Sequence, residues 1–206
     1  MLQVDGFGGS GRGRGRGPAH RFTLYVEGPR DRSILRAWAY RLLPSEARRL
    51  FRASVILGGR QPARALDHFR SAGAGAGGAR ALCVLDRDDG GAAPPHAVEA
   101  GLEFFTWGRR HIESYLLVPT AIRRALRLPD SDRRVERVLE GRLPEEGDAS
   151  AWTDLDAKRL LGPKGELPRA LGRPLPLERI ARVTREDELH PDVHSLFERL
   201  RAELAP

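Results

Sequence analysis

The chain has 206 residues, of which 40% are hydrophobic and 31% charged, and its formal net charge is +7 at pH 7. These values fit one sizeable α/β domain with a small helical addition. No apolar run approaches the roughly 18–20 residues that span a bilayer, and the single cysteine, Cys83, excludes a disulfide framework and a cysteine-based zinc site. We therefore expect no membrane partner and a reducing cytoplasm. The basic charge favours a nucleic-acid partner, although GC-rich codon usage explains it equally well.

Composition separates a leader from a domain. Residues 1–20 are rich in glycine and arginine and are expected to be disordered, whereas residues 21–206 are expected to fold as one domain. Within the domain, runs of β-forming residues alternate with amphipathic stretches of helical period. The predicted elements, in chain order, are a strand at 21–28, a helix at 29–43, a strand at 53–59, a helix at 62–72, a strand over the apolar run 81–85, a strand at 101–107, and helices from 108–126 onward.

This alternation predicts the fold class. Strands that alternate with helices favour a parallel sheet with helices on its faces. We therefore predict an α/β fold with a central, mainly parallel four-stranded sheet, flanked by helices and followed by a C-terminal helical extension. In such folds, ligands bind beyond the carboxyl ends of the strands.

Acidic residues stand at two of these predicted strand ends. Glu27 closes the first strand, immediately before Gly28, and Asp86 closes the third, ahead of Asp88 and Asp89. Each pattern alone is commonly a solvated loop or a turn. At matching ends of two parallel strands the side chains can converge, because neighbouring strands lie about 4.8 Å apart. Gathered carboxylates repel one another unless a cation lies among them, and oxygen ligands suit Mg²⁺ or Mn²⁺.

Four segments resemble the motifs of one family. "VEGPRD" (26–31) and "LDRDDG" (85–90) are similar to the strand-ending Glu-Gly and Asp-x-Asp-Gly motifs of the Toprim domain. "RRHIESYLL" (109–117) resembles the Arg-x-x-Glu-Asn-Tyr-Leu stretch of OLD-family (overcoming lysogenization defect) Toprim nucleases and of small defence-associated Toprim proteins. "DLDAKRLLG" (154–162) resembles the segment that carries the active-site lysine of that branch. The four motifs follow the family's order between residues 22 and about 203.

The chain departs from the family's pattern at three points. Pro29 is unusual in the first motif, and Ser114 stands where the branch favours asparagine. No Gly-Lys-Ser/Thr stretch of a P-loop occurs. We therefore expect that the ATPase domain of the full OLD proteins is not part of this chain.

The resemblance implies a Toprim-like Rossmannoid fold and a two-metal phosphodiesterase. Two cations about 3.5–4 Å apart can activate a water and stabilise the leaving oxygen. Lys158 and Glu27 are the implied catalytic residues. Asp31 follows the Glu-Gly pair by one helical turn and can point back to the same edge of the sheet. Whether Asp89 supports the site or is only a turn residue stays open. The implied ligands of the two Mg²⁺ or Mn²⁺ ions are Glu27, Asp31, Asp86, Asp88 and Glu113.

Basic residues are the other candidates. Only Lys158 and Lys164 among the 35 basic residues are lysines. A compact ammonium can stabilise developing charge or protonate a leaving oxygen where a planar guanidinium fits poorly, whereas Lys164, in "GPKGE", is predicted to lie in an exposed turn. Arg109 and Arg110 are expected to contact nucleic-acid phosphate, or else only solvent. His111 is expected at the surface or at a helix entry, and a catalytic part for it stays open.

We therefore expect a metal-dependent nuclease that cleaves DNA or RNA in defence against phage or other foreign nucleic acid. A separately encoded ATPase or sensor protein is an expected partner, and a homo-oligomer stays open. The alternative is a non-catalytic effector subunit that binds metal and nucleic acid within an ATPase-containing complex. A small Toprim ribonuclease also stays open, because two-metal chemistry serves DNA and RNA alike.

Three other classes fit less well. Topoisomerases need a nucleophilic tyrosine and large gate domains, whereas Tyr25, Tyr40 and Tyr115 lie in apolar contexts typical of core packing. Primases need template-binding modules for which this chain has little room. Nucleotide-sugar transferases also use an Asp-x-Asp metal motif, but they would not account for the Glu27-Gly28 pair or for "HIESYLL".

Overall fold

The computed structural model describes residues 22–52, 54–72, 78–87, 99–145 and 147–205. The predicted leader, residues 1–20, lies outside these ranges and stays a prediction. Among the described helices, none is long and apolar enough to cross a bilayer.

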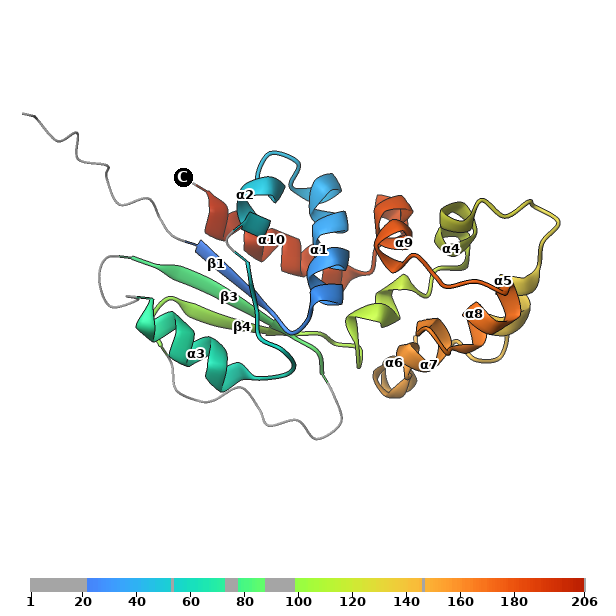
Figure 1. Cartoon of the computed structure of the whole chain (residues 1–206), viewed down its shortest axis with the longest axis horizontal. Coiled ribbons are helices and arrows are strands. Elements are labelled where there is room, and N and C mark those ends of the chain that lie inside the picture. Colours follow the sequence, from blue (N-terminus) through green and yellow to red (C-terminus); the bar gives the residue numbers. More distant parts are fainter. Residues whose placement is uncertain (1–21, 53, 73–77, 88–98, 146, 206) are drawn as a thin grey trace, which may run out of the picture.

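A four-stranded sheet forms the centre of the fold (Figure 1). The strand order is β2-β1-β3-β4, and every neighbouring pair is parallel. This confirms the predicted α/β class with a parallel four-stranded sheet. The strands are β1 (Phe22–Val26), β2 (Val55–Ile56), β3 (Arg80–Leu85) and β4 (Leu102–Thr106).

The register brings the carboxyl ends of the strands to one edge of the sheet. Val26 of β1 pairs with Val84 of β3, and Val84 pairs with Phe105 of β4. The acidic residues that follow β1 and β3 therefore emerge side by side.

Apolar side chains cover both faces of the sheet, as expected for a central parallel sheet. Along β1, Leu24 and Val26 pack into one core and Tyr25 into the other. Helix α3 lies on the Tyr25 side, and α1, α2 and α10 lie on the opposite side (Figure 1). These helices are α1 (Pro29–Leu42), α2 (Ala47–Arg52), α3 (Pro62–Ser71) and α10 (Pro191–Leu204).

Short helices form a second layer beyond the carboxyl edge of the sheet (Figure 1). This layer is the predicted helical extension, and α9 joins it to the sheet domain by packing against α1. Its elements are η1, a 3₁₀ helix (Ile112–Leu116), α4 (Pro119–Leu126), α5 (Arg134–Leu139), α6 (Ala149–Asp154), α7 (Ala157–Leu161), α8 (Glu166–Leu171), α9 (Leu177–Val183) and the 3₁₀ helix η2 (Glu186–Glu188).

Around β2, one sequence expectation was wrong and one helix was missed. The strand predicted at 53–59 contains only Val55–Ile56, because Gly58 and Gly59 take positive φ angles of 82° and 123° and donate their amides to the Glu27 carbonyl. The preceding helix α2 was not predicted. Its buried residues, Ala47, Leu50 and Phe51, have the i, i+3, i+4 spacing of an amphipathic helix, so the sequence pattern could have predicted it.

The expected core packing of all three tyrosines was wrong for Tyr40. Tyr25 and Tyr115 are buried, but Tyr40 is 51% exposed. Tyr40 follows the buried Trp38 by two residues, which places it about 200° around a helix of 3.6 residues per turn. Its side chain therefore leaves the core face of α1.

Candidate metal centre

The ends of β1 and β3 are joined by a hydrogen bond through a predicted site residue. The backbone amide of Asp86 donates to Glu27 Oε1 at 2.7 Å. The carbonyl of Asp86 in turn accepts from Arg60 Nε at 3.0 Å. The Glu27 carboxylate therefore fixes the position of the backbone from which the Asp86 side chain projects.

Asp31 lies in the first turn of α1, where a carboxylate is favoured by the helix dipole. Its Oδ2 accepts a hydrogen bond of 2.6 Å from the amide of Gly28. Pro29 follows Gly28 at the first helical position, where its fixed φ and missing N–H are tolerated. A Cβ at Gly28 would lie 3.2 Å from the Asp31 Oδ2, so the glycine permits this close approach.

Glu113 lies in η1 and is 1% exposed. The preceding residue, Ile112, donates its amide to Asp86 Oδ1 at 2.8 Å, which ties η1 to the end of β3. Arg30 donates from one terminal nitrogen to Glu113 Oε1 at 3.2 Å. The other oxygen, Oε2, is buried and accepts no hydrogen bond from the part of the chain that the structure describes.

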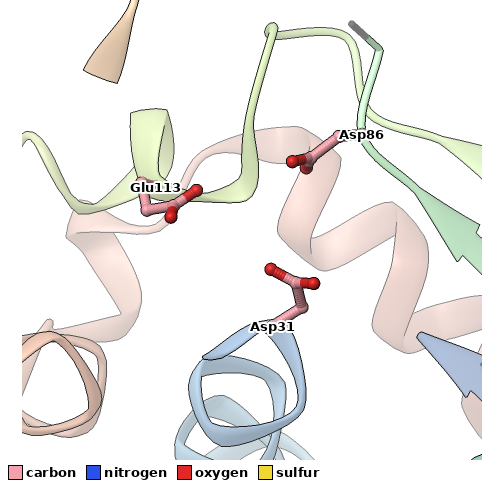
Figure 2. A group of neighbouring side chains, drawn as sticks. All are labelled: Asp31, Asp86 and Glu113. Atoms are coloured by element: carbon pink, nitrogen blue, oxygen red, sulfur yellow. The ribbon is translucent and has the colours of Figure 1, made fainter. Parts of the chain in front are cut away.

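Three of the predicted ligands converge on one space. Asp31, Asp86 and Glu113 each offer a carboxylate oxygen, and these oxygens lie within 4.8 Å of one another. Figure 2 shows the three side chains reaching toward a common centre from the start of α1, the end of β3 and η1. They are close enough to bind one metal ion. The predicted ligand Asp88, and with it Asp89, lies outside the described residues.

The electrostatics of the cluster favour a cation. Burial, and next the Glu113 carboxylate, raise the pKa of Asp31 from 3.8 to about 6. Burial, and next the Asp31 carboxylate, raise the pKa of Asp86 from 3.8 to about 7, although the Ile112 amide and Lys158 oppose this shift. A divalent cation bound among the oxygens would supply the missing positive charge. The all-oxygen donor set and the unpartnered Glu113 Oε2 fit a hard ion such as Mg²⁺ or Mn²⁺.

Lys158 reaches the cluster from the helical layer. It lies in α7, whose first turn is capped by Asp156 through the amides of Lys158 and Arg159. The Lys158 Nζ lies 3.4 Å from Asp86 Oδ2, and the lysine side chain is 46% exposed. Lys164 lies in an exposed turn, as predicted.

The two predicted phosphate contacts differ in their surroundings. The Arg109 guanidinium lies 3.6 Å from the centroid of the Trp152 ring and donates to the Ser114 carbonyl at 3.0 Å. These contacts bind it within the protein, on the side of the aromatic cluster that contains Tyr115. Arg110 donates to the Asp154 carbonyl at 3.5 Å. A nucleic-acid role for either arginine stays a prediction.

His111 and Arg30 show where reading the sequence fell short. The expectation of a surface position for His111 was wrong, because the residue is 5% exposed, but its place at a helix entry is confirmed, since it precedes η1. Arg30 was overlooked, although it lies inside the first motif. Its contact with Glu113 spans 83 residues, so no local pattern announces it.

The fold and this cluster define an α/β protein with an acidic centre at the carboxyl edge of a parallel sheet. Among solved structures, the chain is similar to the C-terminal region of the Xanthomonas campestris pv. campestris OLD protein, with a TM-score of 0.47 and 18% sequence identity over 88% of this chain and 92% of that chain. No family model matches the sequence, and no curated protein matches it. The family relationship therefore remains the motif resemblance described above.

Proposed function

We propose that this chain is a metal-dependent nuclease domain that hydrolyses phosphodiester bonds of DNA or RNA. The observation that carries the proposal is the convergence of Asp31, Asp86 and Glu113, whose oxygens lie within 4.8 Å. Three acids at the ligand-binding edge of a parallel sheet fit a cation that holds a phosphate. The order of the four motifs supports the same reaction class.

The chain's own residues have distinct roles in this proposal. Asp31, Asp86 and Glu113 would hold the first ion, and Glu27 and Asp88 would complete a second site. Bound Mg²⁺ or Mn²⁺ would supply Lewis-acid stabilisation of the attacking and leaving oxygens. Lys158, with its ammonium 3.4 Å from Asp86, would stabilise negative charge on the leaving group or protonate it.

The setting that we infer is defence against phage or other foreign nucleic acid. The resemblance to small defence-associated Toprim proteins supports this role. The same resemblance is the basis for proposing a separately encoded ATPase or sensor protein as the partner that controls the activity.

One observation favours the non-catalytic alternative. Two cations of the protein already lie beside the cluster, Arg30 at 3.2 Å from Glu113 and Lys158 at 3.4 Å from Asp86. These pairs offset part of the carboxylate repulsion without metal. In an effector subunit that does not cleave, the same acids would serve structure or regulation.

Cleavage assays separate the two functions. Purified protein would be incubated with supercoiled plasmid, single-stranded DNA and RNA, each with Mg²⁺, with Mn²⁺ or with EDTA. We expect metal-dependent cleavage of at least one substrate, its loss in Glu113→Gln, and its retention in Glu145→Gln, which changes an exposed acid outside the cluster. Intact substrates under every metal condition would favour the effector subunit.

A further inference from the structure

A basic hollow of about 500 Å³ opens in the helical layer, between α4 and the segment that leads into α5. Five arginines and two acidic residues are among those that line it. We refer to this feature as the arginine hollow. None of its lining residues belongs to the acidic cluster described above.

The inner arginines of the hollow are neutralised. Arg123 donates to Glu136 Oε1 at 2.9 Å and to the carbonyl oxygens of Asp132 and Pro129 at 2.9 and 2.8 Å. Arg124 is similarly held by the Glu188 carboxylate and by the Val183 carbonyl. These contacts shape the wall of the hollow and leave little of their charge for a ligand.

The outer arginines provide an excess of positive charge. Arg127, Arg133 and Arg185 are exposed. Within the described ranges, neither Arg127 nor Arg185 has a salt bridge to an acidic side chain, and Arg133 lies 4.0 Å from Glu136, which Arg123 already occupies. Three guanidinium groups around a concave surface therefore face solvent.

Arg127 has an unfavourable backbone conformation. Its φ and ψ are 52° and 43°, in the left-handed region, where it ends α4 by donating its amide to the carbonyl oxygens of Arg123 and Arg124. Glycine or asparagine is the usual residue at such a helix end, because a Cβ is strained there. All other described residues with positive φ are glycines. A strained non-glycine residue motivates a search for a function that its side chain performs.

We infer that the arginine hollow is a second nucleic-acid contact, which binds backbone phosphates at a distance from the cleaved bond. The inference rests on the proposed function and adds an anchoring site to it. The planar guanidinium forms paired hydrogen bonds to phosphate oxygens. Three exposed guanidiniums match a chain of repeated phosphates better than a single small anion. The hollow thus contributes affinity without base specificity.

Binding without cleavage tests this inference. Fluorescence anisotropy would follow a labelled DNA duplex bound to the full chain in EDTA. The variants are Arg127→Gly, a triple variant that adds Arg133→Ala and Arg185→Ala, and the control Arg48→Ala. Arg48 is an exposed arginine of α2, on the sheet domain far from α4 in Figure 1. All single variants remove the same charge.

Two opposite changes are expected for Arg127→Gly. The variant should melt at a higher temperature than wild type, because glycine relieves the backbone strain, and it should bind DNA about threefold more weakly. The triple variant should bind at least about tenfold more weakly, and its log–log salt slope should be smaller by about 0.9 for each lost phosphate contact. Arg48→Ala should match wild type in both measurements.

Three outcomes would overturn the inference. The triple variant could bind DNA as tightly as wild type, or Arg48→Ala could lose as much affinity as the hollow variants. Alternatively, polyglutamate could displace the labelled DNA as effectively as unlabelled DNA does, which would point to an acidic protein partner. The proposed function is judged separately, by metal-dependent cleavage and its loss in Glu113→Gln. A wild type that cleaves no substrate but whose DNA binding in EDTA depends on the three arginines would count against the nuclease and not against the hollow, so the two failures are distinguishable.

Discussion

The ammonium group of Lys158 lies 3.4 Å from the Oδ2 of Asp86, although 72 residues separate the two in the sequence. The lysine comes from the helical layer and the aspartate from the end of β3. This pair places a proton donor at the edge of the acidic cluster, where a bound phosphate would be held. An ammonium delivers its charge as a compact group, whereas a guanidinium is a larger planar fork that releases its proton far less readily.

Replacing Lys158 by arginine should therefore impair the chemistry selectively. We expect Lys158→Arg to lower the cleavage rate by about 100-fold or more, the size of effect typical for the loss of one preorganised electrostatic group. The metal affinity and melting temperature should stay near those of wild type, because the charge is kept. Lys164→Arg, in an exposed turn, is the matched control. Equal nicking of plasmid by the two variants would remove Lys158 from the mechanism.

Neutralising Glu113 should separate metal binding from folding. Glu113 is 1% exposed and adds a negative charge beside Asp31. Glu113→Gln relieves that repulsion, so the metal-free variant should be as stable as wild type or more stable. Thermal melts with and without Mn²⁺ measure this. Wild type should gain about 2.7 kcal/mol at a Mn²⁺ concentration 100 times the Kd, and the variant should gain little.

The same thermal melts include a control variant and can also contradict metal binding by the cluster. Glu145→Gln, which changes an exposed acid, should keep the full Mn²⁺ stabilisation. A wild-type protein with no Mn²⁺ stabilisation would show that the cluster does not bind metal.

The pH dependence of stability should carry the signature of the cluster. In metal-free protein, Asp86 has a pKa raised to about 7 by burial and by Asp31, against about 3.9 in an unfolded chain. Between these values the folded state binds a proton that the unfolded state does not, so the free energy of unfolding falls as pH rises from about 4 to about 7. Asp31, with a pKa raised to about 6, acts in the same direction.

Urea denaturation in EDTA at pH 5 and pH 7.5 measures this slope. Burial lowers the pKa of His190, which gives the opposite slope near neutral pH, so wild type must be compared with Asp86→Asn. The variant should lose less stability, or gain more, over this interval than wild type. Parallel pH profiles for the two proteins would contradict the raised pKa of Asp86.

Local patterns predicted the strand-end part of the site but not its far side. Each of the two strands is one continuous apolar run, and the runs end at Glu27 and at Asp86. The strands could therefore be predicted from local sequence, and parallel pairing predicted that their ends lie side by side. Glu113 and Lys158 were implied only by motif resemblance. Their positions depend on how η1 and α7 pack beyond the sheet, through contacts such as the Ile112 amide with Asp86. Such packing has no periodic signature in the sequence.

Charge contacts within the protein were the hardest to predict. Arg109 was expected to contact phosphate or else only solvent; its phosphate contact stays untested, but its stacking on Trp152, 43 residues later in the chain, was not predicted. Arg30, next to Asp31 at the start of α1, likewise joins Glu113, which lies 83 residues later in the chain. The tertiary fold determines which arginine contacts which partner. In an arginine-rich chain, many arginines are equally plausible partners when only the local sequence is considered.

Gly28 provides a test of how closely the cluster is positioned. Its backbone is extended, with φ −140°, so alanine can adopt the same conformation. The added Cβ would lie 3.2 Å from the Asp31 Oδ2, however, and the carboxylate would have to move by a few tenths of an ångström. We expect Gly28→Ala to weaken Mn²⁺ binding by about 10-fold or more, the effect typical of disturbing a group that orients a metal ligand. The melting temperature without metal should change little.

Isothermal titration with Mn²⁺ measures this effect against a matched control. Gly147→Ala places a Cβ where no atom lies within 4 Å, so its Mn²⁺ affinity should equal that of wild type. The size of the loss in Gly28→Ala depends on Asp31, because the Gly28 amide and the Asp31 carboxylate are hydrogen-bonded at 2.6 Å. In an Asp31→Asn background the alanine should therefore cause no further loss of affinity. An additive loss there would show that Gly28 acts through a residue other than Asp31.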